Sequence, residues 1–170
     1  MSARYMVFLD IDGVLTSTRV HMSSGNREEL WSQFDPVAVQ FLNWIHDTVS
    51  DVHFMLISTW KEGMRLEGDN SSHWVLSALR NAGFRGTLSA TWKSNPDNLQ
   101  RFKHRAWEIK DYLDYHPEVK DFIIFDDTDY NFDQVLGKNR WIRTDSREGM
   151  LTKHMLNAKS IIGGWIEQPF

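Results

Sequence analysis

The stretch YMVFLDIDG, residues 5–13, decides the fold of this chain, because it joins a run of five apolar residues to two acids and a glycine. A short, uninterrupted apolar run that ends in polar residues is typical of a strand buried on both faces of a parallel sheet. The sequence therefore predicts a central strand that ends just before Asp10, with Asp12 and Gly13 in the turn that follows.

The rest of the chain alternates strands with helices. Further apolar runs predict strands at 52–57, at 122–125 and, more weakly, at 140–143. Apolar residues at helical spacing predict helices over the ranges 36–49, 75–82, 106–113 and 151–162. A loop is expected at 61–72, and at most one short strand in 86–100. This alternation predicts an α/β fold with a mainly parallel sheet covered by helices on both faces.

The length and composition narrow the class of protein. A chain of 170 residues predicts a single domain over 1–170. The absence of cysteine excludes disulfides, thiolate zinc sites and cysteine nucleophiles. A net charge of −4 argues against a wholly basic nucleic-acid-binding surface. No apolar run reaches the length of a membrane span and no signal peptide is evident, so we expect a cytoplasmic protein without membrane association.

Polar side chains follow three of the predicted strands. Because ligands bind at the carboxyl ends of parallel strands, these residues are expected to share one crevice. Carboxylates that close repel one another, and a divalent cation that prefers oxygen ligands removes the repulsion, so we predict Mg²⁺. The groups are Asp10 with Asp12 after the first strand, Ser58 with Thr59 after the second, and Asp126 with Asp127 after the third.

Several motifs resemble those of the haloacid dehalogenase-like (HAD) phosphatases. FLDIDGVLTS at 8–17 resembles the first motif, Ser58 in LISTW the second, and FIIFDD at 122–127 the fourth. The segments ISTW, RAWEI and TDSREGMLTKH are similar to a compact branch associated with RNA repair, which resembles the phosphatase half of polynucleotide kinase–phosphatases. The resemblance implies a three-layer, Rossmann-like HAD fold and a Mg²⁺-dependent phosphomonoesterase.

The resemblance also implies a role for each acid. Asp10 is expected to be the nucleophile that forms an aspartyl-phosphate. Asp12 is expected to be the general acid and base, with its backbone carbonyl on the metal. Ser58 is expected to bind a phosphoryl oxygen, and Asp127 to join Asp10 as a Mg²⁺ ligand. Asp126 stands where many members of the family carry Gly, so it is expected to be an outer-shell or alternative ligand.

The third motif requires a basic residue near the start of the helix before the last acids. Arg105, four residues before Ile109, has the spacing of the compact branch, whereas Lys103 is the more usual residue type. Arg105 is favoured, and Lys103 stays an alternative. The residues expected to line the substrate-binding side are Gly13, Thr59, Trp60 and Lys61.

The intervals 13–35 and 60–105 are too short for a domain-sized cap, so an open site is expected. An open site admits bulky substrates such as a nucleic-acid end or a phosphoprotein, and nucleotides also fit. Basic residues gather in 80–105, where aromatic side chains are interleaved with them, a pattern suited to nucleic acid. They are Arg80, Arg85, Lys93, Arg101, Lys103 and Arg105, with Trp92 and Phe102 among them. Outside this range, Arg19 and Arg65 are further candidates for phosphate contacts on loops.

Two other functions fit parts of the pattern. A metal-dependent nuclease would use the same acids as a two-metal site. A phosphate-binding or regulatory module on the same scaffold would bind without turnover, although Asp10 and Asp12 are both present. The sequence does not identify a protein partner.

Overall fold

Four parallel strands form the sheet, in the order β2-β1-β3-β4. The computed structural model describes residues 3–24, 34–58, 72–89 and 105–166. The predicted α/β class and parallel sheet are confirmed, and each strand lies within two residues of its predicted bounds. The strands are β1 Tyr5–Leu9, β2 Val52–Leu56, β3 Asp121–Asp126 and β4 Trp141–Arg143.

The register of the sheet aligns the carboxyl ends of its strands. Leu9, the last residue of β1, lies opposite both Leu56 of β2 and Phe125 of β3. At the next position, the backbone N–H of Asp10 donates to the carbonyl of Phe125 at 2.9 Å. Residues that follow β1 and β3 are therefore neighbours at one edge of the sheet.

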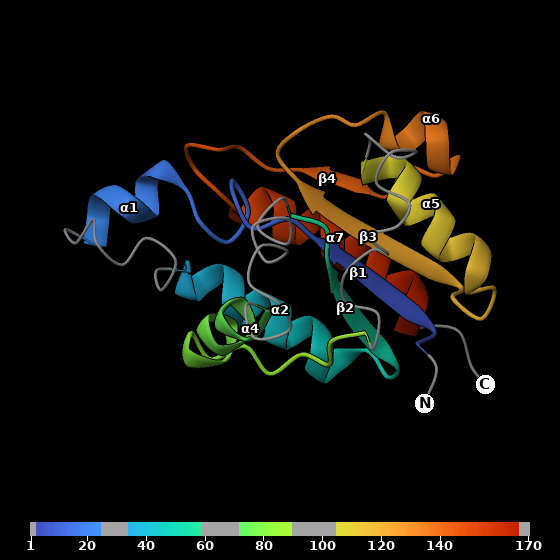
Figure 1. Cartoon of the computed structure of the whole chain (residues 1–170), viewed down its shortest axis with the longest axis horizontal. Helices are drawn as coiled ribbons and strands as arrows, with labels where there is room; N and C mark the ends of the chain where they lie inside the picture. The colour runs from blue at the N-terminus through green and yellow to red at the C-terminus, as the bar shows by residue number, and fades with distance from the viewer. Residues whose placement is uncertain (1–2, 25–33, 59–71, 90–104, 167–170) are drawn as a thin grey trace.

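Helices cover both faces of the sheet, which confirms the predicted three layers (Figure 1). α2, α4 and α7 pack with the odd-numbered β1 side chains in one hydrophobic cluster, whereas α5 and α6 pack with Met6 and Phe8 in the other. The alternation of side chains along a strand produces these two clusters. The helices are α1 Thr18–Ser24, α2 Pro36–Thr48, α4 Ser72–Asn81, α5 Arg105–Tyr115, α6 Phe132–Leu136 and α7 Thr152–Ile166.

Two short helices were not predicted. α1 buries only Val20 in the core, and it is capped by Ser17, whose Oγ accepts from the N–H of Val20 at 3.3 Å. α6 has five residues; Phe132 is buried, and Val135 and Leu136 pack against the same hydrophobic cluster. α1 has no apolar repeat, and α6 is little more than one turn long, too short for an apolar repeat to identify it.

In the described part of the 86–100 range, residues 86–89, the expected short strand is one bridge at the β2 edge. The N–H of Phe54 donates to Thr87 O at 2.8 Å, and the N–H of Ser89 donates to Phe54 O at 2.9 Å. Most of the predicted 61–72 loop lies outside the described residues, although Ser72 already belongs to α4. Within the described ranges, α1 is the one helix between β1 and α2, so no domain-sized cap is seen there.

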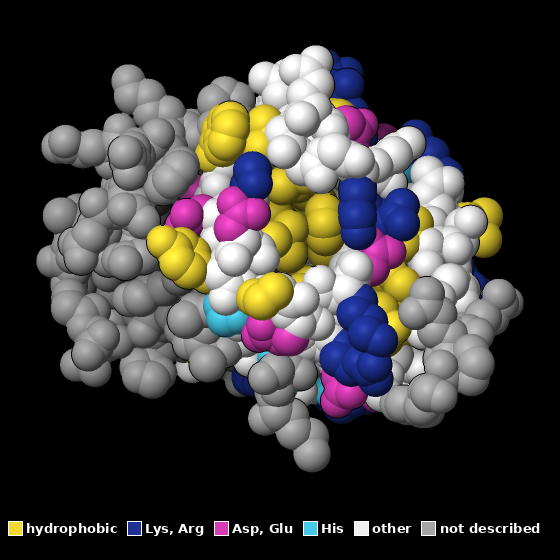
Figure 2. All heavy atoms as spheres, turned by 90° about the vertical axis from the view of Figure 1, so that its right-hand side faces the viewer, with side chains coloured by type: hydrophobic (Ala, Val, Ile, Leu, Met, Phe, Trp, Pro, Cys, Tyr) yellow, Lys and Arg dark blue, Asp and Glu magenta, His cyan; other side chains and the backbone are white. Residues whose placement is uncertain are grey.

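A pocket of about 220 Å³ lies away from the acids, between α5, α6 and the start of β3. Figure 2 shows this face, where apolar side chains form a hollow between charged ones. The lysines at its rim are Lys110, Lys120 and Lys138.

Of the helices in the described ranges, none combines the length and apolar character that crossing a membrane needs.

The core around Phe8 supplies a direct test of this packing. Phe8 is fully buried and makes edge-to-face contacts with Tyr112 of α5 and Phe122 of β3. Phe8→Ala should lower the free energy of unfolding by about 3–5 kcal/mol, because it leaves a cavity between β1 and α5. Leu156→Ala, at a 60% exposed position, should change it by less than about 0.5 kcal/mol in the same urea titration. Equal effects of the two variants would contradict the assigned core.

Candidate active site

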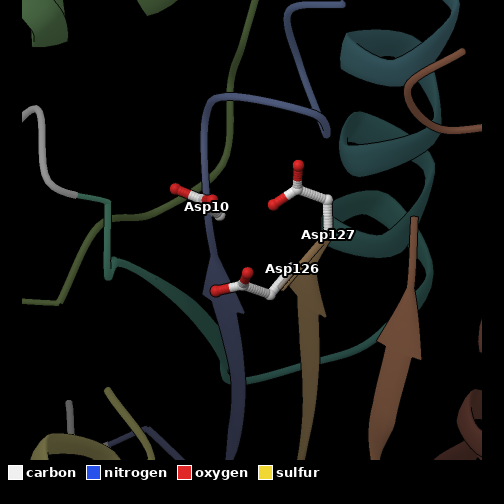
Figure 3. A group of neighbouring side chains, drawn as sticks. All are labelled: Asp10, Asp126 and Asp127. Atoms are coloured by element: carbon white, nitrogen blue, oxygen red, sulfur yellow. The ribbon is translucent and has the colours of Figure 1, made fainter. Parts of the chain in front are cut away.

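Three carboxylates meet at the carboxyl edge of the sheet. Asp10 follows β1, Asp126 ends β3 and Asp127 begins the loop after it. One oxygen from each lies within 4.8 Å of the others. Figure 3 shows the three side chains around a common space. The structure thus brings Asp10 of the first motif together with both fourth-motif acids, as the sequence predicts, whereas Asp12 is not one of the three clustered carboxylates.

Arg105, the first residue of α5, links two of these acids. Its Nη1 lies 2.8 Å from Asp10 Oδ2 and 2.6 Å from Asp126 Oδ2. Burial lowers the pKa of Arg105, but the charges of Asp10 and Asp126 outweigh that effect and raise it, so the guanidinium stays charged. Of the two third-motif candidates, Arg105 is therefore in the site, whereas Lys103 lies outside the described residues.

Asp10 is buried, with 2% of its surface exposed. Its Oδ1 accepts from the backbone N–H of Ile11 at 2.8 Å. Burial raises the pKa of Asp10, although Arg105, the N–H of Ile11 and a hydrogen bond from Ser58 all act to lower it. Ser58, which is also buried, therefore lies at the site as the second motif predicts.

Asp126 is fully buried and has both oxygens engaged within the protein. Oδ2 accepts from Arg105, and Oδ1 accepts from the N–H of Thr128 at 2.9 Å. Burial and the nearby charge of Asp10 raise the pKa of Asp126 to about 6, although Arg105 acts in the opposite direction. With both oxygens engaged, Asp126 is better suited to hold Arg105 in place than to bind a metal directly.

Asp127 reaches the common space because Gly13 has no side chain. A Cβ at Gly13 would lie 2.4 Å from Asp127 Oδ2, and Gly13 also has a φ of +71°, which favours glycine. The other oxygen, Oδ1, accepts from the Thr128 hydroxyl at 3.0 Å. Gly13 therefore leaves room for the Asp127 side chain and allows the tight turn after β1.

Asp12 is exposed, in contrast to Asp10. Its Oδ1 accepts from the hydroxyl of Thr16 at 3.2 Å. The turn that joins these residues is closed by the N–H of Thr16, which donates to Ile11 O at 3.0 Å. Asp12 thus lies two residues beyond Asp10 on a hydrogen-bonded turn, with its side chain open to solvent.

Other predicted site residues fall outside the described ranges or face elsewhere. Thr59, Trp60 and Lys61 lie outside the described residues, as do Arg65, Trp92, Lys93, Arg101 and Phe102. Arg80 donates to the carbonyls of Phe84 and Gly86, at 2.8 and 3.0 Å. Arg85 pairs with Asp47. Arg80 and Arg85 therefore support the local fold, which weakens the predicted basic surface over 80–105.

Two aromatic residues that the sequence did not single out border the site. The guanidinium carbon of Arg105 lies 4.9 Å from the centre of the Tyr130 ring. The indole N–H of Trp141 donates to the backbone carbonyl of Asp126 at 3.0 Å. Neither contact leaves a signal in the sequence, because each depends on how β4 and α5 pack beside the loop after β3.

The donor set fits Mg²⁺. Carboxylate oxygens are the ligands this ion prefers, and it binds through one or two carboxylates with water and phosphate oxygens. Arg105 pairs with Asp10 and Asp126 but not with Asp127, so three carboxylates are accompanied by one guanidinium and negative charge is left over. Asp10 and Asp126 each give one oxygen to Arg105, so Asp127, which Arg105 does not contact, is the best-placed ligand, and the resemblance to the HAD phosphatases adds Asp10.

Comparison with protein families agrees with the observed fold and with the acidic residues at the sheet edge. A family model described as the HAD domain in Swiss Army Knife RNA repair proteins matches residues 6–155. The chain belongs to this family, which makes it a HAD-type hydrolase domain in general terms, and HAD proteins generally use Mg²⁺. A search of curated proteins and a search of solved structures found no match.

Gly13→Ala should displace Asp127 and weaken Mg²⁺ binding about 10-fold or more, because the new methyl group would overlap Asp127 Oδ2. Gly137→Ala is the matched control, since Gly137 has a similar φ of +65° but nothing within 4 Å of its added Cβ. The measurement is a calorimetric Mg²⁺ titration of each variant. Equal affinities in the two variants would contradict the assigned contact.

The raised pKa of Asp126 predicts a pH dependence of stability in the cation-free protein. The folded state holds this proton up to a pH of about 6 and the unfolded state only to about 4. The free energy of unfolding should therefore fall as pH rises through this window. Asp126→Asn should reduce that fall by on the order of 2 kcal/mol in urea titrations.

Asp114→Asn is the control for this comparison, because Asp114 is an exposed carboxylate paired with Lys110. It should leave the fall in stability between pH 4 and pH 7 unchanged. An unaltered fall in Asp126→Asn would show that Asp126 does not titrate in this window.

Proposed function

We propose that the protein is a Mg²⁺-dependent phosphomonoesterase that acts through an aspartyl-phosphate on Asp10. The observation that carries this proposal is the pairing of the buried Asp10 carboxylate with Arg105, beside Asp127 at the sheet edge. A carboxylate fixed in this way can approach the phosphorus of a substrate along one direction. Arg105 offsets the negative charge that otherwise repels the phosphate.

In the first step, an oxygen of Asp10 attacks phosphorus and the bond from phosphorus to the leaving oxygen breaks. Asp12 donates its proton to the leaving alkoxide, which departs as an alcohol. The hydroxyl of Thr16 holds the Asp12 carboxyl on the turn. The buried Ser58, beside Asp10, would donate a hydrogen bond to a phosphoryl oxygen.

In the second step, water attacks the phosphorus of the aspartyl-phosphate while Asp12 accepts its proton. The acyl phosphate bond breaks, which restores the Asp10 carboxylate and releases inorganic phosphate. Asp10, Asp127 and the backbone carbonyl of Asp12 would hold Mg²⁺, which would offset charge on the nucleophile and the phosphate. Asp126 takes part by keeping Arg105 on Asp10.

The family of RNA repair proteins supports a phosphorylated nucleic-acid end or a nucleotide as the substrate. The short segments in place of a cap, as far as they are described, are consistent with a bulky substrate. A single domain over 1–170 and a cytoplasmic location stay predictions from the sequence.

Release of phosphate from an aryl phosphate in the presence of Mg²⁺ tests this proposal. Asp10→Asn should lower kcat by on the order of 10³-fold or more, because the nucleophile is lost. Asp114→Asn should retain the wild-type rate, since its carboxylate pairs with Lys110 on the exposed face of α5. Full activity in Asp10→Asn, or cleavage of internal phosphodiesters in place of phosphate release, would overturn the phosphatase assignment.

A further inference from the structure

Three side chains form a row across the carboxyl edge of the sheet. Asp10 follows β1 and Asp126 ends β3, each one position beyond the paired Leu9 and Phe125, and Arg143, the last residue of β4, lies opposite Asp126. Register partners on adjacent parallel strands project from the same face. The chain itself supports this assignment, because Phe8, Ile124 and Trp141, two residues before each member of the row, belong to one hydrophobic cluster.

The row extends outward from the acids into solvent. Adjacent strands are about 4.8 Å apart, so the Cα atoms of Asp10 and Arg143 are separated by about 10 Å. Asp10 and Asp126 are buried, whereas Arg143 is exposed. The Arg143 guanidinium is thus placed at the side of the site, one strand beyond the acids.

Arg143 differs from most other arginines in the described ranges, because no carboxylate in those ranges pairs with it. Arg19 pairs with Asp35, Arg85 with Asp47, and Arg140 with Asp121. The guanidinium of Arg143 instead lies over the Trp141 ring, 5.7 Å from its centre. Its donors therefore stay available to a ligand, while stacking limits where the side chain can move.

The ring beneath Arg143 is itself fixed to the site. Trp141 donates its indole N–H to Asp126 O and packs against Phe132, with ring centres 5.7 Å apart. Phe132 in turn packs against Tyr130, the ring under Arg105. Two guanidiniums, one bound to the acids and one open to solvent, thus rest on one connected group of aromatic rings.

We propose that Arg143 binds a second phosphate of the substrate, next to the phosphoryl group that Asp10 attacks. This inference rests on the proposed phosphatase activity and names its substrate class, a nucleic-acid end with an internucleotide phosphate beside the terminal one. A guanidinium is suited to this role because its planar fork binds two oxygens of one phosphate. A substrate with a single phosphate leaves Arg143 without a ligand.

Binding and turnover together test this inference. The ligands are an aryl phosphate, mononucleotides with one 3′ or 5′ phosphate, and the matching phosphorylated dinucleotides, which carry a second, internucleotide phosphate. Binding is measured by calorimetry in the Asp10→Asn background, where turnover is removed, and kcat/KM is measured with the nucleophile intact.

Arg143→Gln should weaken binding and lower kcat/KM for one dinucleotide about 10- to 100-fold, as expected for a lost charge-assisted hydrogen-bond pair. It should change the mononucleotide and aryl phosphate values less than about 2-fold. It should also reduce the slope of log affinity for that dinucleotide against log salt by about 1. Arg143→Lys should restore part of the loss, because it keeps the charge without the fork.

Lys159→Gln is the matched control. Lys159 also lies over a tryptophan, with its ammonium 5.2 Å from the Trp44 ring centre, but it belongs to α7 on the other face of the sheet. This variant should bind and turn over every ligand as the wild type does.

The two proposals fail in different ways. Equal losses on all ligands in Arg143→Gln, or no selective loss on either dinucleotide, would overturn the role of Arg143. If the wild type releases no phosphate from any ligand while dinucleotide binding still depends on Arg143, the two-phosphate site is supported and the phosphatase proposal fails.

Discussion

One interaction organises the site: a single guanidinium nitrogen of Arg105 bonds two buried carboxylates, Asp10 and Asp126. Burying a charge costs free energy unless a partner of opposite sign accompanies it, and two carboxylates this close would otherwise repel. Arg105 provides that partner from the first turn of α5. The packing of α5 on Met6, Phe8 and their neighbours is therefore also what fixes the charge balance at the sheet edge.

Arg105 does not neutralise all the negative charge at the site. Asp127 adds a third carboxylate that Arg105 does not contact, and Gly13 gives it room. The site therefore holds more negative than positive charge, yet its proposed substrate is an anion. A divalent cation with Arg105 removes this conflict, and Arg143 supplies further positive charge at the open side. Each feature follows from where the strands end and how they are ordered.

The strand ends could be predicted from the sequence, because a buried parallel strand is a continuous apolar run and the polar residues that follow it mark its end. This pattern predicts that Asp10, Asp126 and Asp127 lie together at one edge of the sheet. Arg105 is favoured instead by the resemblance to the compact branch, whose basic residue has the same spacing to the position of Ile109. Tyr130, Trp141 and Arg143 could not be found, because their contacts depend on the order of strands in the sheet and on packing between distant segments. α1 could not be predicted because it buries a single side chain, Val20, and α6 because its five residues are too few for an apolar repeat to identify a helix.

The central claim is that Asp10 acts as a nucleophile toward phosphorus. The most direct measurement is the intact mass of the protein after acid quenching during turnover of a phosphomonoester with Mg²⁺, followed by peptide mapping. The account predicts one added phosphoryl group on the peptide that contains Asp10, which disappears on treatment with hydroxylamine. Turnover with no phosphoryl group trapped, or a phosphoryl group on another residue, would contradict it.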